Sequence, residues 1–552
     1  MTALENIQGQ TILMIDDLKA ICTSYGLGNS GNEYKIITET FLYKFLNDKF
    51  FYEIRKANPE YQGLDTAEIE RRLAALSEDE LELLSLGLPA NVARIKPAQF
   101  ISTLFNQKAK QGFHKIFDEA LTAIADQNRD VFSVKAGGDS SVSLFETLSN
   151  YVVQTEKRDA FCAALVNKLA NVSFDAIFGQ KYDFFADIFE YLIKDYNKDF
   201  GKYAEYYTPH SIARIIAKIL VPQGDENVRI YDPAAGSGTL ILALAHEIGE
   251  ENCTLYTQDI SQKSNEILRL NLILNNLVHS LPNVIQEDTL LNPRHLTKDK
   301  KAVAVFDYVV SNPPFNMDFS ESRDTLAGEA YKKRFFAGVP NIPNKKKDSM
   351  AIYQLFLQHI LGSMDNTKGK AAVVVPTGFL TASTGIPLKI RKYIVEKKLL
   401  RGVISMPSNI FANTGTNVSV LFLDAKGTPD GKALLVDASN LGTKQKIEGT
   451  KNQRTYLSDE EIERIIETFN KREEQKDFSV LVALDEIEKK KYSFSAGQYF
   501  KVEIEYVDIT PEEFQAKMQG FKDELCRSFQ EGRELEQEIE RQLGDLVYEE
   551  ME

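Results

Sequence analysis

The sequence predicts an α/β protein with a largely parallel sheet, a helical N-terminal domain and a helical C-terminal tail. Between about residues 200 and 425, short runs rich in β-branched and aromatic residues alternate with stretches of helical periodicity. This pattern is typical of βαβ units with helices on both faces of the sheet. Residues 1 to about 165 have mostly helical spacing, and the last 40 or so residues carry an apolar stripe among charged residues.

The length and composition are those of a soluble globular protein with several domains. The chain has 552 residues, of which 43% are hydrophobic and 26% are charged, and a domain usually contains roughly 150 residues. No stretch approaches the roughly 20 apolar residues of a membrane-spanning helix, and the N-terminus does not resemble a signal peptide. Because the four cysteines and six histidines are scattered, we expect no metal site and a cytoplasmic location.

The formal net charge of −15 argues against a chain that binds nucleic acid strongly on its own. Domains that do so are usually basic. If this protein acts on nucleic acid, we therefore expect a partner to supply much of the affinity.

Four segments are expected along the chain: a helical domain over 1–165, an α/β domain over 166–425, a small α/β extension over 426–510 and amphipathic helices over 511–552. In the last segment the helical pattern is interrupted near Gly532. Such helices pack on another helix, either of their own domain or of a partner. The stripe consists of Phe514, Met518, Phe521, Leu525, Phe529, Leu535, Ile539, Leu543 and Leu546.

Seven runs in the α/β segment are predicted to be strands. In sheets of this kind, ligands bind beyond the carboxyl ends of the parallel strands. The side chains that follow each strand are therefore the candidate site residues. The expected strands cover residues 228–231, 254–258, 284–286, 306–310, 371–375, 403–406 and 418–423, with helices over 239–248, 262–277 and 350–361 between them.

A small-residue turn, Asp-Pro-Ala-Ala-Gly-Ser-Gly-Thr, follows the first of these strands over residues 232–239. Gly236 and Gly238 let the backbone turn sharply and approach a ligand closely, and the carboxylate of Asp232 suits a ligand ammonium group. The turn is not a dinucleotide fingerprint, because Ile241 stands where a third glycine is required. Taken alone, this motif would favour a purely structural turn between a strand and a helix.

The next two strands also end near acidic residues, Asp259 and Asp288. Asp259 lies about 20 residues beyond the glycine turn, the spacing at which a carboxylate can hold a ribose diol. Asp288 can accept a hydrogen bond from an exocyclic amine such as that of adenine. Any one of these aspartates could instead cap a helix. Together they predict a ligand with an adenosine group and an ammonium group.

The fourth strand runs directly into Asn312-Pro313-Pro314-Phe315. The prolines stiffen the loop and keep Asn312 extended. The side-chain oxygen of Asn312 and the carbonyl of Pro313 can both accept hydrogen bonds from one amino group, and Phe315 offers an aromatic face for a flat base. This arrangement suits an exocyclic amine whose nitrogen acts as a nucleophile.

In this order, the glycine turn, the acids and Asn-Pro-Pro-Phe resemble the amino-group DNA methyltransferases that use S-adenosylmethionine. More closely, the chain resembles the modification subunit of type I restriction–modification systems, which implies a Rossmann-like methyltransferase sheet and a methyltransferase domain over 166–425. Residues 399–416 and 495–500 also resemble family segments. So does a cofactor-contacting segment made of Glu205, Tyr206, Tyr207, Thr208, Pro209 and His210, with Thr208 as the expected helix cap.

The resemblance implies methylation of N6 of adenine in double-stranded DNA, with the target base flipped out of the stack. It implies that S-adenosylmethionine is bound by the segment over 205–210 and by Asp232, Gly236, Ser237, Gly238, Thr239, Asp259 and Asp288, with Asn312, Pro313, Pro314 and Phe315 at the target base. The expected partners are a specificity subunit shared by two modification subunits and, where the system also cleaves DNA, a restriction subunit.

Two points stay open from the sequence. The basic runs at 332–334 and 345–347 suit either DNA phosphates or a solvated loop. The alternatives to the implied function are a stand-alone amino-methyltransferase, acting on cytosine N4 or on an RNA or protein amide substrate, and a non-catalytic scaffold subunit.

Overall fold

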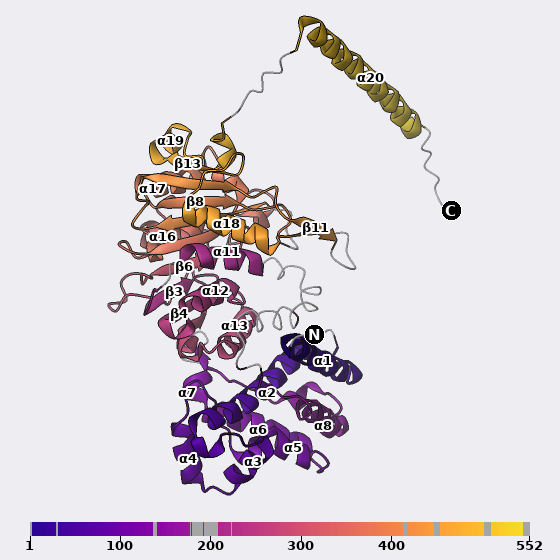
Figure 1. Cartoon of the computed structure of the whole chain (residues 1–552), viewed down its shortest axis with the longest axis vertical. Coiled ribbons are helices and arrows are strands. Elements are labelled where there is room, and N and C mark those ends of the chain that lie inside the picture. Colours follow the sequence, from indigo (N-terminus) through magenta and orange to yellow (C-terminus); the bar gives the residue numbers. More distant parts are fainter. Residues whose placement is uncertain are drawn as a thin grey trace. The chain divides into compact units, whose positions relative to one another are not determined.

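A computed structural model of the chain contains two compact units, Met1–Phe500 and Lys501–Glu552 (Figure 1). It describes residues 3–28, 31–135, 141–176, 178, 191, 208–221, 224–411, 417–446, 453–501 and 509–544. Within these residues no helix is both long and apolar enough to cross a bilayer.

The first part of the larger unit, up to Leu169, is mostly helical, as the sequence predicts, and is called the helical part below. Its central helix, α2 (Gly31–Ala57), is buried along most of its length and on most of its faces. The surrounding helices are α1 (Ala3–Ser24), α3 (Thr66–Ala74), α4 (Glu78–Leu86), α5 (Ile101–Gln107), α6 (Phe113–Gln127), α7 (Arg129–Phe132) and α8 (Arg158–Leu169).

The second part is built on an 11-stranded mixed sheet with the order β13-β10-β8-β9-β7-β6-β3-β4-β5-β1-β2. The prediction of an α/β sheet is confirmed. The strands are β1 (Val134–Lys135), β2 (Ser141–Val142), β3 (Val228–Asp232), β4 (Cys253–Asp259), β5 (Val284–Gln286), β6 (Tyr308–Ser311), β7 (Lys370–Pro376), β8 (Leu400–Ser405), β9 (Val418–Asp424), β10 (Lys432–Asp437) and β13 (Ser479–Ala483); β11 (Thr443–Lys446) and β12 (Gln453–Tyr456) form a separate ribbon.

The sheet crosses two of the segment limits expected from the sequence. Strand β1 comes from the helical part and pairs with β5 through Lys135 and Ile285. At the other edge, β10 and β13 of the expected extension over 426–510 continue the same sheet beyond β8. Strands β10 and β13 of this segment therefore complete the large sheet.

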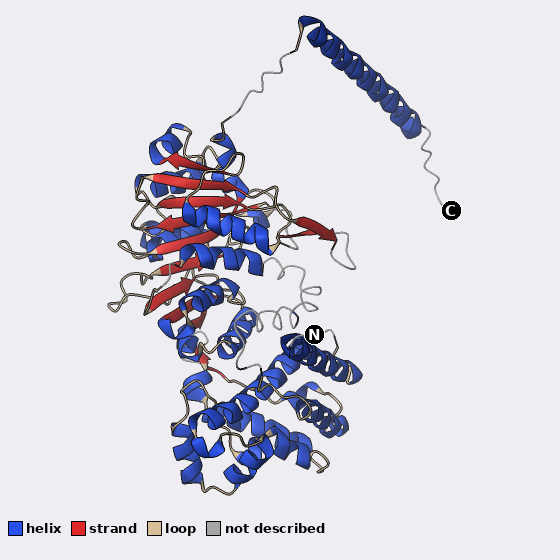
Figure 2. Cartoon of the chain, in the orientation of Figure 1, coloured by secondary structure: helices blue, strands red, loops and turns tan. Residues whose placement is uncertain are grey.

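Helices cover both faces of the sheet (Figure 2). Alternate residues of β7 show why: Ala372 and Val374 pack in one core cluster, while Val373 and Val375 pack in the other. The first cluster continues into the helical part and holds α11 (His210–Leu220), α12 (Thr239–Ile248), α13 (Gln262–Leu274) and α18 (Asp459–Lys471); the second holds α16 (Tyr353–Ser363), α17 (Gly385–Glu396) and α19 (Leu484–Lys489). The short helices α14 (Arg323–Leu326) and α15 (Glu329–Lys332) follow β6.

Among its described residues, the smaller unit contains a single helix, α20 (Pro511–Gly544). The expected interruption near Gly532 is wrong, because a glycine in an exposed helix costs only about 1 kcal/mol relative to alanine. Thr510 and Glu513 cap the first turn reciprocally. The apolar side chains of the stripe are each 51% to 63% exposed, except that Leu546 lies outside the described residues.

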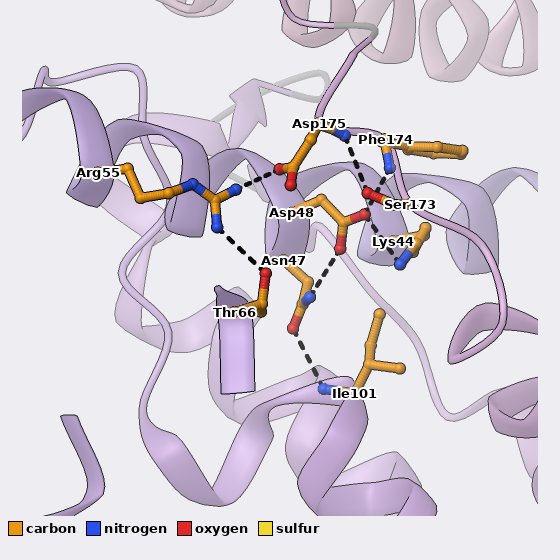
Figure 3. A network of polar contacts seen from close by, with 9 residues as sticks. All are labelled: Lys44, Asn47, Asp48, Arg55, Thr66, Ile101, Ser173, Phe174 and Asp175. Atoms are coloured by element: carbon orange, nitrogen blue, oxygen red, sulfur yellow. Dashed lines mark hydrogen bonds and ion pairs between the residues drawn. The ribbon is translucent and has the colours of Figure 1, made fainter. Parts of the chain in front are cut away.

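A buried polar network holds the segment that follows α8 against α2 (Figure 3). Lys44 and Asp48 form an ion pair of 2.8 Å, with side chains only 6% and 9% exposed. The Asp48 carboxylate also accepts from the Phe174 amide at 2.9 Å and from Asn47 Nδ2 at 2.9 Å. Asn47 Oδ1 in turn accepts from the Ile101 amide at 3.1 Å. Asn47 and Asp48 of α2 thus hold two segments that are distant in sequence, one at Ile101 and one at Phe174.

Replacing Asp48 with alanine is expected to lower the free energy of unfolding by about 3–5 kcal/mol, because it leaves a buried ammonium group without its partner. A matched control is Lys489→Ala, which removes an ion pair to Asp485 whose side chains are 75% and 72% exposed and is worth less than about 1 kcal/mol. The measurement is the midpoint of urea unfolding. Equal midpoints for the two variants would contradict the role of the network.

Candidate active site

The predicted site residues converge because β6, β3, β4 and β5 are neighbouring parallel strands. The carboxyl ends of parallel strands meet at one edge of a sheet. The glycine turn follows β3, Asp259 ends β4, and Asn312 follows β6. Asp288 lies two residues beyond the end of β5.

A cavity of about 790 Å³ opens at this edge. Five predicted residues line it: Gly236, Asp259, Asp288, Asn312 and Pro314. Its apolar side comes from Leu290, Met317, Ile352 and Phe356, and another wall comes from the helical part of the chain. The sequence motifs gave no sign of these additional residues.

Asp232 lies deeper, at 2% exposure, beside a smaller cavity that it shares with Thr208, Ser237, Thr239 and Asn312. Its Oδ1 atom accepts hydrogen bonds from the Ala234 amide at 3.0 Å and the Ser311 hydroxyl at 2.9 Å. Burial, with a smaller contribution from nearby Asp259, raises the pKa of Asp232 to about 7. A ligand cation placed here would stabilise the ionised carboxylate.

The carboxylate of Asp259 connects the glycine turn to the end of β4. Its Oδ2 atom accepts from the Gly236 amide at 2.9 Å, and its Oδ1 atom accepts from the Ser261 amide at 2.8 Å. Burial raises the pKa of Asp259. Each carboxylate oxygen has a second acceptor position, so hydrogen bonds from a ligand diol are compatible with this arrangement.

Asp288 shapes the backbone on the far side of the cavity. Its Oδ1 atom accepts from the amides of Leu290 and Leu291 at 2.8 and 3.0 Å. Asp288 thus combines a turn-capping role with a position on the cavity wall.

Asn312 is oriented by Thr208. Its Nδ2 atom donates to the Thr208 hydroxyl at 3.1 Å, which leaves Oδ1 as the acceptor. The expectation that Thr208 caps the following helix is wrong: α11 begins at His210, and Pro209 occupies the cap position without a side-chain bond. The fixed φ of proline suits that position as well as the first turn. Glu205, Tyr206 and Tyr207 lie outside the described residues.

Pro313 is buried, and Phe315 is half-buried. The Phe315 side chain packs against both core clusters and is not among the residues that line the large cavity. Its ring therefore also anchors the loop to the core on both sides of the sheet.

The sequence model of the family described as N-6 DNA Methylase matches residues 180–507. The chain belongs to the N-6 DNA methylase family. The MpnII methylase subunit, a type I restriction enzyme subunit of Mycoplasma pneumoniae, is 28% identical over 86% of this chain and 85% of its own length. The MjaVIII methylase subunit of Methanocaldococcus jannaschii is 26% identical over 90% and 80%. The predicted membership is confirmed, and the chain is a DNA methyltransferase.

Solved structures confirm the fold class. The methyltransferase subunit of a type I restriction–modification system from Streptococcus thermophilus superposes with a TM-score of 0.66 at 20% identity, covering 91% of this chain and all of that one. A chain from a study of complex assembly and conformational transition in a type I system gives a TM-score of 0.52 at 17% identity, covering 98% and 99%.

In the first basic run of this methylase, Lys332 and Lys333 are exposed, but Arg334 is partly buried. Arg334 points inward, donates to the carbonyls of Thr289 and Leu290, and lies over the rings of Tyr331 and Phe335. Burial lowers the pKa of Arg334 to about 10. In the second run, by contrast, the side chains of residues 345–347 are exposed.

Gly238 serves packing in this methylase. Its φ of +86° is left-handed, and a Cβ atom there would lie 2.3 Å from Cδ1 of Leu268 on α13. We expect Gly238→Ala to lower the free energy of unfolding by about 2–4 kcal/mol through strain and overpacking. Gly497→Ala is the matched control, because no atom lies within 4 Å of its added Cβ. Thermal unfolding measures both, and an unchanged melting temperature for Gly238→Ala would contradict this packing role.

Proposed function

We propose that this methylase transfers a methyl group from S-adenosylmethionine to N6 of adenine in double-stranded DNA, as the modification subunit of a type I restriction–modification complex. The observation that carries the proposal is the placement of Asn312. Its carboxamide is fixed by Thr208 and lies on the same cavity as Gly236 and Asp259. An acceptor for an amino group thus stands beside residues suited to an adenosine ligand.

The residues fit the proposed cofactor on chemical grounds. Asp232 is buried, and within the described residues no lysine or arginine forms an ion pair with it, so a ligand ammonium group would meet an uncompensated carboxylate. Asp259 would hold the ribose, and Asp288 would accept from the adenine amine. When bound, S-adenosylmethionine supplies an activated methyl group, and the protein then has to align the nucleophile.

The target base has to leave the duplex to reach this site. We propose that Asn312 Oδ1 and the Pro313 carbonyl accept from its amino group and turn the nitrogen lone pair out of the ring plane. The exposed part of the Phe315 ring would stack on the base, an interaction worth about 1–3 kcal/mol in similar contacts. The lysines at 345–347 would contact neighbouring phosphates.

Asn312→Ala is expected to reduce DNA methylation at least about a hundredfold, the scale seen when a fixed catalytic hydrogen-bonding group is lost, with cofactor affinity largely intact. Asn316→Ala is the matched control, because Asn316 is an exposed residue of the same loop. The measurements are incorporation of labelled methyl groups into DNA and calorimetric binding of S-adenosylmethionine. Methylation by Asn312→Ala at the parental rate would refute the mechanism.

Cofactor affinity is expected to depend on pH through Asp232, whose pKa is raised to about 7 in the ligand-free protein. A ligand cation favours the ionised form, so affinity should rise from about pH 5 to about pH 7, by at most about tenfold per pH unit. Calorimetry over this range measures it. Asp232→Asn should bind weakly with a flat profile, and a parental profile without slope would contradict the assignment.

We also propose that α20 contacts a specificity subunit, with two modification subunits per specificity subunit and a restriction subunit in systems that cleave. Two observations support this. The apolar stripe of α20 is more than half exposed along its length, a pattern suited to packing on partner helices. The net charge of −15 opposes strong binding to DNA by the chain alone.

Removing the residues after Pro511 is therefore expected to abolish co-purification with the specificity subunit and sequence-dependent DNA binding, while binding of S-adenosylmethionine stays unchanged. The control is the full-length chain carrying Leu83→Ala, an exposed apolar residue of α4 that is outside the stripe. Normal co-purification of the truncated chain would show that α20 is not the contact.

A further inference from the structure

The large cavity has a wall that none of the methylase motifs supplies. Gly31, Asn32, Tyr34 and Lys35 of the first turn of α2 line it, together with Tyr151. Asp259 and the first turn of α13 line the same cavity. The helical part of the chain thus contributes one wall of the cavity.

Helices α2 and α13 lie side by side and run in the same direction. Lys263, at the start of α13, lies with Nζ 4.9 Å from the ring centroid of Tyr34 at the start of α2. Fifteen residues further along α2, Lys49 donates to Asn276, just after the end of α13. Both helices therefore begin at the cavity.

A single carboxylate holds the exposed part of the wall in place. Glu146 forms an ion pair of 2.5 Å with Lys35 and accepts from the Tyr151 hydroxyl at 3.0 Å. The backbone amide of Glu146 donates to Glu39 on α2 at 2.9 Å. Lys35 and Tyr151 are thus fixed before any ligand binds.

A direct bond also ties this region to the sheet domain. Arg269 on α13 donates to the carbonyl of Ser143 at 2.8 Å. This hydrogen bond and the pairing of β1 with β5 fix the position of the wall relative to the end of β4.

The chemistry of the wall suits a nucleoside. Tyr151 offers a half-buried aromatic ring, and Asn32 offers an exposed carboxamide; both face the cavity that contains Asp259. Among the residues that the structure describes, none from the helical part lines the smaller cavity beside Asp232. The wall therefore lies at the ribose side of the site and away from the carboxylate assigned to the ammonium group.

We propose that Asn32 in the first turn of α2 and Tyr151, which is positioned by Glu146, bind the adenosine half of the cofactor, so that the helical part belongs to the cofactor site. The inference rests on the proposed function, because it requires an adenosine-bearing cofactor in this cavity. It adds binding residues from a segment that carries no methylase motif.

The test is calorimetric binding of S-adenosylmethionine, S-adenosylhomocysteine and 5′-methylthioadenosine to the full-length chain. The last compound lacks the amino-acid half. Tyr151→Ala should weaken all three by a similar factor, about fivefold or more if a base–aromatic contact is lost, and Asn32→Ala, at an exposed position, should weaken all three as well. Tyr456→Ala is the matched control, because Tyr456 is an exposed tyrosine on β12 that is not part of the cavity.

The possible results distinguish a failure of this inference from a failure of the proposed function. Parental affinity of both Tyr151→Ala and Asn32→Ala for all three compounds would overturn the inference alone. Weaker binding of the two cofactor forms with unchanged binding of 5′-methylthioadenosine would also overturn it, because the contact would then be to the amino-acid half. If the unsubstituted chain bound none of the compounds, the proposed function would fail, and the inference with it.

Discussion

The site depends on the parallel pairing of β3 with β4 on one side and β6 on the other. This pairing places the glycine turn, Asp259 and Asn312 at one edge, although they come from three different strands. A register shift of one residue would turn alternate side chains to the opposite face. The hydrogen bond from Gly236 to Asp259 then joins the two loops directly.

The two buried carboxylates at this edge of the sheet lower the stability of the fold when they are ionised. Burial raises the pKa values of both Asp232 and Asp259. With folded pKa values above the ordinary value for aspartate, ionising these groups destabilises the fold as pH rises through that range. A cationic ligand placed beside Asp232 would oppose this effect. Perturbed groups of this kind concentrate at functional sites.

The helical part is integrated with the sheet. The first core cluster runs without interruption from α1 and α2 into the helices that cover the sheet, and β1 extends the sheet itself. A displacement of the helical part would therefore also displace the residues that it contributes to the cavity wall. In α20, the apolar residues of the stripe are exposed, and most of the stability of a helix in a protein comes from packing of its apolar face.

The sequence alone determined the local elements and the motifs. The strand over 284–286 and the helix over 239–248 begin and end where the periodicity predicts, because β-branched runs and strand-to-helix glycine turns are local signals. The motif residues at the strand ends were predictable for the same reason, since parallel order brings such ends together.

Only the tertiary structure decided the contacts between distant segments. Thr208 bonds Asn312, 104 residues away, in place of capping its own helix, and Arg334 turns inward to two carbonyls. Tyr151 reaches the cavity through Glu146, which no motif marks. These side chains have several possible partners in the unfolded chain, and long-range packing selects one, which a local pattern cannot encode.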